Sequence, residues 1–393
     1  MKLQLTKDKT INVKLPWEKG DDGSSSARKS GLSDVVGVSL FDGDARGCPA
    51  VRLVRKKDGI HITAAGFVAS PAVSLPSSWD ESKIQPSWEL PSAYQAPQAA
   101  LAVTSPDMFI RQTTLDALLG ASKGSAAADV KKKKLGVKRN IEEKKPEAKP
   151  VTEEMQPFVP VSRDGSRFVT APMGDEGFIL QAGIPEYQVL WLSRLLPEGR
   201  RPTACSVQTV PAALLNSVYF QPTFKADDGT AVVVFVTRSS IYFAGYRKGD
   251  LLLFRECPDV AGYDVMRELV KSGLGVGDDI VDSILEDTLI DPRPALEPLV
   301  RPVLQQLQLS LDYLAQRHDV HVDKVLLMGL PSGAMYWNQL AQETLGRPFV
   351  SPSAFEGLVT PVKGTAVPAF KPSESQVFLA AAGAAFAAME ETA

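Results

Sequence analysis

Two stretches of the chain carry the same succession of apolar runs and polar turns. The first copy is predicted to form strands at 35–40, 50–55 and 60–68, with Asp-Gly turn sequences after the first and second runs. The second copy is predicted to form strands at 231–237, 240–246 and 251–256. Because each three-stranded meander is followed by helical sequence, the pattern predicts one duplicated α/β fold and not two unrelated domains.

Apolar residues at helical spacing predict helices at 185–196, 299–318, 334–345 and 377–389. The third of these helices follows a strand at 324–328 and a glycine turn at 329–333. That arrangement lets a backbone approach a nucleotide at the carboxyl end of a strand. Many α/β folds have such a turn without a ligand, so the spacing alone leaves nucleotide contact open. The last helix consists mainly of Ala and Gly, which predicts close packing inside the protein.

Two polar segments interrupt these elements. Residues 18–30 are mostly Gly, Ser, Asp and Lys, which predicts a flexible tether. Residues 120–157 contain small residues, then clustered lysines, then Glu and Pro, which predicts a disordered basic loop. Two interpretations of the loop stay open: a solvated linker that its own glutamates partly neutralise, or an electrostatic tether to an anionic surface.

The composition narrows the class of protein. With 393 residues, 44% hydrophobic and 23% charged, the chain is long enough for two soluble domains. A net charge of -3 gives no reason to expect a nucleic-acid partner. Its three cysteines form no CxxC pair and its three histidines no metal motif, so neither disulfides nor a metal site are expected. We find no signal-peptide core and no membrane-spanning run, which predicts a cytoplasmic protein.

The order of these pieces resembles the actin-like ATPase superfamily, and within it the PilM family of type IV pilus assembly proteins, related to FtsA and to the cytoplasmic domain of GspL. The resemblance covers about residues 34–389. The segments that carry it most specifically are 101–112, which resembles the strand entering an inserted subdomain, and 255–258, 324–350 and 378–383. It implies an α/β actin-like duplicated fold of two domains with an inserted subdomain.

The expected organisation follows from this resemblance. Residues 1–31 form a flexible tail, 32–215 form domain I, and 216–393 form domain II. The inserted subdomain occupies about 100–205 and contains the disordered basic loop. The C-terminal helix of domain II is expected to return to domain I.

The resemblance also implies an ATP site between the two halves, with Mg and the phosphates held by two loops that each begin Asp-X-Gly. Here the two positions of the first loop fall on Ser39 and Phe41, and those of the second loop on Phe235 and Thr237. Both acids are missing, and Mg needs hard oxygen ligands while phosphate loops need glycine. We therefore expect no Mg site and no efficient ATP hydrolysis, whereas weak ATP binding stays open.

Several residues of the degenerate pocket remain candidates for contact with a nucleotide. Asp42 and Gly43 follow the first loop directly, where the alternative is a solvated hairpin tip. The later glycine turn is better preserved, although Pro331 stands where a third glycine is expected. The full set of candidates is Ser39, Asp42, Gly43, Thr237, Ser239, Ser240, Gly329, Ser332 and Gly333.

A short apolar island precedes the tether. Its sequence, with Asn12, Leu15, Pro16 and Trp17, resembles the Asn-Leu-Leu-Pro-containing cytoplasmic peptide of PilN, the membrane protein that docks into a groove on PilM. An extended peptide with Pro and a large apolar anchor suits groove binding. The alternative is a disordered head with no ligand role.

Together these features predict a cytoplasmic scaffold of a type IV pilus or type II secretion-like assembly. The expected partners are a PilN-like bitopic membrane protein or its peptide, other inner-membrane components of the assembly, and a second copy of the chain in a homo-oligomer. Such partners would hold the protein at the inner face of the inner membrane. The alternative function is an active actin-like ATPase or filament former of the FtsA type.

Overall fold

The computed structural model describes residues 2–6, 9–12, 32–41, 46–72, 75, 88–114, 166–174, 177–196, 202–225, 229–286, 290–359 and 372–390. Several predicted features lie outside these residues: Asp42 and Gly43, the basic loop 120–157, and the peptide residues Leu15, Pro16 and Trp17.

The first main sheet contains five strands in the order β10-β6-β3-β4-β5. Its meander consists of β3 (Asp34–Leu40), β4 (Cys48–Lys56) and β5 (Gly59–Val68), joined antiparallel as the sequence predicts. Strands β6 (Gln98–Val103) and β10 (Thr203–Thr209) extend the sheet in parallel to β3.

The second main sheet repeats this plan with four strands in the order β13-β12-β11-β14. A predicted meander is again confirmed, in β11 (Thr230–Val236), β12 (Ser240–Arg247) and β13 (Asp250–Ala261). Strand β14 (Lys324–Met328) lies parallel to β11, as β6 does to β3. The repeated arrangement, a meander with a parallel strand beside its first strand, is the structural form of the predicted duplication.

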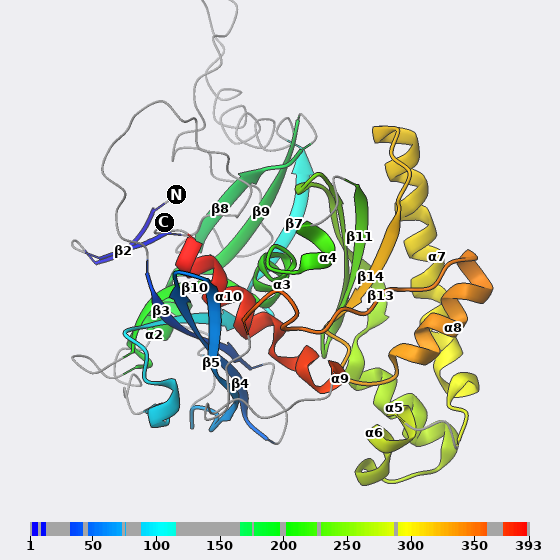
Figure 1. The fold of residues 1–393 in the computed structure, drawn as a ribbon, viewed down its shortest axis with the longest axis horizontal. Coiled ribbons are helices and arrows are strands. Elements are labelled where there is room, and N and C mark those ends of the chain that lie inside the picture. The colour runs from blue at the N-terminus through cyan, green and yellow to red at the C-terminus, as the bar shows by residue number, and fades with distance from the viewer. Residues whose placement is uncertain are drawn as a thin grey trace, which may run out of the picture.

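A third sheet stands between the two main sheets at one side of the molecule (Figure 1). It has the order β7-β9-β8, with β7 (Phe109–Thr114), β8 (Ser166–Pro172) and β9 (Phe178–Pro185). The segment 101–112, expected as one strand, is divided: β6 ends at Val103 in the first main sheet, and β7 begins at Phe109 in the third. Helix α2 (Glu186–Arg194) follows β9 directly, with Pro185 as its N-cap residue.

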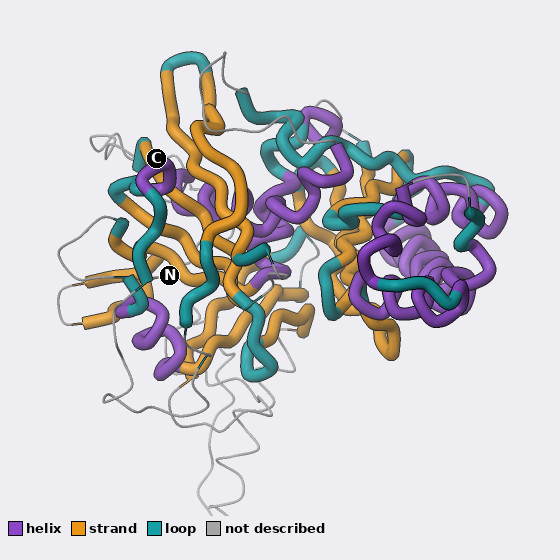
Figure 2. The backbone as a smooth tube through the Cα atoms, turned by 90° about the horizontal axis from the view of Figure 1, so that it is seen from below, coloured by secondary structure: helices purple, strands orange, loops and turns teal. Residues whose placement is uncertain are grey.

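The helices separate into two groups. Figure 2 shows that those of the second half gather at one end of the molecule. They are α5 (Tyr263–Leu274), α6 (Asp278–Glu286), α7 (Arg293–His318) and α8 (Ala334–Leu345). Helix α7 begins six residues before the predicted start, because the exposed Pro298 and Pro302 lie within it instead of ending it. None of the helices within the described ranges is long and apolar enough to cross a membrane.

The other group packs on the first main sheet. Helix α3 (Val210–Val218) contacts α10 (Leu379–Glu390), and α10 in turn contacts β3, β4 and β6. The short elements α4 (Pro222–Lys225), α9 (Pro372–Ser375), and the 3-10 turns η2 (Ser92–Tyr94) and η3 (Gln376–Phe378) complete the described helical structure. Residues 379–389 of α10 are all buried, which confirms the closely packed terminal helix.

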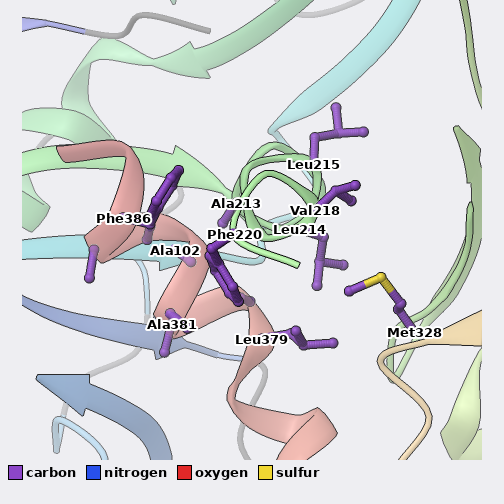
Figure 3. Packing of buried hydrophobic residues seen from close by; sticks show 14 of the residues in the cluster. Ala102, Ala213, Leu214, Leu215, Val218, Phe220, Met328, Leu379, Ala381 and Phe386 are labelled. Carbon is purple, nitrogen blue, oxygen red and sulfur yellow. The ribbon is translucent and has the colours of Figure 1, made fainter. Parts of the chain in front are cut away.

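Small residues allow α10 to approach its neighbours closely. A Cβ atom added at Gly37 would lie 1.8 Å from the carbonyl oxygen of Ala381, and one at Gly383 would lie 1.9 Å from that of Ala213. Figure 3 shows Ala381 and Phe386 of α10 beside Ala213 and Phe220. Buried side chains from residue 35 to residue 389 form a first core, which surrounds the first main sheet and includes one face of the second. A second core, on the other face of the second main sheet, uses residues 232–349.

The chain begins with two short antiparallel strands, β1 (Lys2–Thr6) and β2 (Lys9–Asn12), within the range expected as a flexible tail. They form a separate two-stranded sheet. Strand β2 lies beside β10, and β1 lies beside α2.

Candidate functional site

A cavity of about 610 Å³ lies between the two halves of the molecule. Its volume is in the range of small-molecule sites in proteins. The first half contributes an apolar wall that includes Phe67, Leu214 and Ala380, and the second half contributes mainly polar and charged groups. We refer to this cavity as the central cleft.

The structure places only part of the predicted nucleotide-contact set at the central cleft. Thr237, Gly329 and Ser332 line it. Ser239 lines a separate pocket of about 130 Å³, and Gly333 faces the apolar side chains of Met266 and Leu285. Ser39 is fully buried in β3, and Ser240 is bonded within its own hairpin.

In the first loop, Phe41 has a backbone conformation that is typical of glycine. Phe41 has a φ of 61°, in the left-handed region that a bulky side chain rarely adopts. Its ring lies 6.4 Å from the ring of Trp191. An aromatic side chain therefore occupies the position where a phosphate loop needs an open backbone.

The second loop is hydrogen-bonded within itself and to the start of helix α5. The Thr237 amide donates to the Ser240 carbonyl at 2.9 Å, and the Ser240 amide donates to Thr237 Oγ1 at 3.0 Å. The carbonyls of Thr237 and Arg238 accept from the amides of Tyr263 and Asp264 at 2.8 and 3.0 Å. Amides at a helix N-terminus are natural anion donors, but these first amides of α5 are already bonded to the loop.

Two arginines of the central cleft each form an ion pair with a carboxylate of the same cleft. Arg238 makes a bidentate contact with Asp264, with Nε and Nη2 at 3.1 and 2.8 Å from Oδ1. Arg267 Nε lies 3.1 Å from Asp282 Oδ1, which also accepts from the Tyr263 hydroxyl at 2.7 Å. Burial is the largest cause that raises the pKa of Tyr263, so this hydroxyl stays a neutral donor.

The described lining of the central cleft is also richer in acids than in bases. Three arginines face five carboxylates: Arg46, Arg238, Arg267, Asp264, Asp278, Asp282, Glu286 and Glu374. A triphosphate carries several negative charges, so an excess of carboxylates repels it. Within the described ranges, no three His, Cys, Asp or Glu side chains are grouped so that they could hold a metal ion.

The third turn is filled by a glutamine from the C-terminal segment. The Gly329 amide donates to Gln376 Oε1 at 2.8 Å, and Gln376 Nε2 donates to the Pro352 carbonyl at 2.7 Å. The Gln376 side chain is buried, and it connects the start of α10 with the second main sheet. Sequence reasoning missed this residue, because Gln376 is one of four consecutive polar residues, 373–376, before the Ala-rich helix and nothing in the sequence distinguishes it from the others.

A second set of contacts joins the halves through the inserted sheet. The Phe254 amide of β13 donates to Gln112 Oε1 at 2.9 Å, and the Gly174 amide donates to the Leu251 carbonyl at 2.8 Å.

Taken together, the described residues do not fit Mg-ATP: the groups that would receive it are bulky, acidic or already bonded to the protein.

No protein-family model matches the chain, and no curated protein matches it. A solved structure described as the PilM-PilN type IV pilus biogenesis complex aligns with a TM-score of 0.58 at 14% identity. The alignment covers 92% of this chain and 99% of that one. This match confirms the predicted actin-like fold over nearly the whole length.

Two further solved structures overlap less well. A Bacteroides thetaiotaomicron protein with an actin-like ATPase fold and unknown function gives a TM-score of 0.39 at 10% identity, over 85% of this chain and 98% of that one. The cytoplasmic domain of EpsL, an inner-membrane component of the Vibrio cholerae type II secretion system, gives 0.27 at 11% identity, over 62% and 78%. The fold assignment rests on the first match and on neither of these.

Proposed function

We propose that this chain, which has a PilM-like actin-like ATPase fold, is a scaffold of a type IV pilus or type II secretion-like assembly and not an ATPase. The observation that carries the proposal is the occupied third turn, where Gln376 bonds to Gly329 while the actin-like fold is otherwise complete. Such a chain retains the shape of the fold for binding partners and has lost the groups that nucleotide chemistry needs.

The proposed partner is the cytoplasmic peptide of a PilN-like bitopic membrane protein. Support comes from the solved relative, which is a PilM-PilN complex, and from the similarity of the segment from Asn12 to Trp17 to such a peptide. In this proposal the protein works in the cytoplasm, held at the inner face of the inner membrane by its partners.

The first test is nucleotide turnover. We expect the purified chain to show no Mg-dependent ATP hydrolysis above a buffer control, measured as phosphate release at millimolar ATP. Replacing Asp42 by Ala should change nothing, because the proposal gives this carboxylate no Mg to hold. Mg-dependent hydrolysis that the Asp42→Ala variant loses would show an active site and would reject the proposal.

The second test is partner binding without nucleotide. We expect a fluorescent peptide with an Asn-Leu-Leu-Pro core to bind the chain, measured by fluorescence anisotropy, with the same affinity in the presence and absence of Mg-ATP. A peptide of the same composition in scrambled order is the control. Equal binding of both peptides, or a need for ATP, would contradict the scaffold proposal.

A further inference from the structure

The segment that follows α8 crosses from the second half of the molecule to the first (Figure 1). At its start, the Val350 amide donates to the Val325 carbonyl at 2.8 Å, and the Val350 carbonyl accepts from the Leu327 amide at 2.9 Å. Val350 thereby forms a parallel bridge to β14, an outermost strand of the second main sheet. We refer to residues 350–359 as the strap.

The other end of the strap forms the same kind of bridge to the first main sheet. The Val359 amide donates to the Ile60 carbonyl at 2.9 Å, and the Val359 carbonyl accepts from the Ile62 amide at 3.1 Å. These bonds join the strap to β5, an outermost strand of the first main sheet. One short segment is thus hydrogen-bonded to an edge of each main sheet.

The middle of the strap is also fixed, by groups next to α3 and α10. The Ala354 carbonyl accepts from Gln221 Nε2 at 3.1 Å, and the Ala354 amide donates to Ser375 Oγ at 3.2 Å. The side chains of Phe355 and Leu358 are buried in the first core. Because the strap is bonded at both ends and packed between them, it has no free length to absorb a movement of one half against the other.

The opposite edge of the second main sheet is held by the inserted sheet. The strand order places β13 and β14 at the two ends of the second main sheet. Gly174 and Gln112 of the inserted region bond to β13, and the Tyr219 hydroxyl donates to the Gly249 carbonyl beside it at 3.1 Å. The second main sheet is therefore connected to the first half at both of its edges, and a rotation about one connection would break the other.

We propose that the strap and the inserted sheet together fix the angle between the two halves, so that the central cleft neither opens nor closes. Hinge closure needs a few connecting residues that are free to change their backbone angles, whereas the backbone of the strap is paired to both main sheets. The proposal goes beyond the scaffold function and does not depend on it. A partner bound to one half would move both halves as a single body.

Double electron–electron resonance between two spin labels tests the fixed angle. Labels at Ser92→Cys, beside β4 and β5, and at Ser283→Cys, in α6, report the distance between the halves, and both positions are exposed. Cys205→Ser removes the half-buried native thiol, whereas Cys48 and Cys257 are buried and stay unlabelled. We expect one distance peak that does not shift when Mg-ATP is added. Two peaks, or a shift above about 2 Å, would overturn the proposal.

A label pair within the second half gives the width expected of one rigid body. Ser283→Cys with Gln339→Cys serves as this control, because both positions are exposed on helices of the same half. The peak between the halves should be no more than about twice as wide as the control peak. A wider peak would show that the halves move against each other and would overturn the proposal without any change to the strap.

Release of one end of the strap should allow the halves to move. Val359→Pro removes the amide that bonds to Ile60, so the peak between the halves should become at least about two-fold wider. The Ile62 amide should then exchange with deuterium at least about ten-fold faster. Val359→Thr retains the amide and the strand propensity, and it should behave like the parent chain.

The remaining outcomes of this experiment are also decisive. Faster exchange at Ile62 without a wider peak would show that the strap only covers the edge of β5, and it would overturn the fixed angle. Unchanged exchange at Ile62 would show that the contact with β5 is not made in solution, with the same consequence. If Val359→Pro does not fold, the two distance peaks of the parent chain decide. A wide parent peak together with specific binding of the Asn-Leu-Leu-Pro peptide would reject the fixed angle and retain the scaffold function.

Discussion

Gly383→Ala is expected to lower the free energy of unfolding by about 3 kcal/mol, the upper part of the range for overpacked cores. The added Cβ would lie 1.9 Å from the carbonyl oxygen of Ala213, and both contacting atoms belong to tightly packed helices. Helix propensity alone predicts the opposite sign, because alanine in a helix interior is more stable than glycine by about 1 kcal/mol. The sign of the change therefore decides whether the close contact between α10 and α3 controls stability. Urea denaturation followed by tryptophan fluorescence measures it.

Ser283→Ala is the control, because Ser283 is an exposed residue of α6. This substitution also raises helix propensity, but it adds no atom to a packed interface, so we expect a change within about 0.5 kcal/mol. If Gly383→Ala proves as stable as the parent chain or more so, α10 and α3 are not in tight contact.

Gln376→Ala is expected to lower the free energy of unfolding by about 2 kcal/mol. The variant leaves the Gly329 amide and the Pro352 carbonyl without their side-chain partner, and an unsatisfied buried group costs about 1–3 kcal/mol. The same denaturation experiment measures the effect. We expect no gain of ATP binding, because the Thr237 and Ser240 amides of the second loop remain bonded within the protein.

Gln339→Ala, at an exposed position of α8, is the matched control and should lie within about 0.5 kcal/mol of the parent chain. A Gln376→Ala variant as stable as this control would mean that the two hydrogen bonds contribute nothing net. A variant that gained tight Mg-ATP binding would show that Gln376 alone blocks the cleft and that the bonded second loop does not.

Elements with strong local signals could be predicted from the sequence. The two meanders follow from apolar runs separated by short polar turns, and β14 and α8 have the predicted bounds, Lys324–Met328 and Ala334–Leu345. The predicted start of α7 was six residues too late, because local rules treat Pro298 as a helix break. In the structure one helix contains Pro294, Pro298 and Pro302, which are spaced four residues apart. Local propensity yields to tertiary packing at such positions.

The internal bonding of the central cleft could not be predicted in the same way. The contact between Gly329 and Gln376 joins residues 47 positions apart, and that between Gln112 and Phe254 joins residues 142 positions apart. No periodicity or motif encodes such pairs, which depend on how complete sheets and helices meet. The loss of both loop acids was visible in the sequence, but the protein groups that fill the turns were not.

The position of α10 also sets the order in which the chain can fold during synthesis. The second core, on one face of the second main sheet, uses residues 232–349 and can form as soon as they have left the ribosome. The first core lacks its central helix until residue 389 is made, although β3 begins at Asp34. At about 5–20 residues per second, on the order of half a minute separates the synthesis of these two elements. The half that is translated first is therefore completed last, when α10 packs on its sheet.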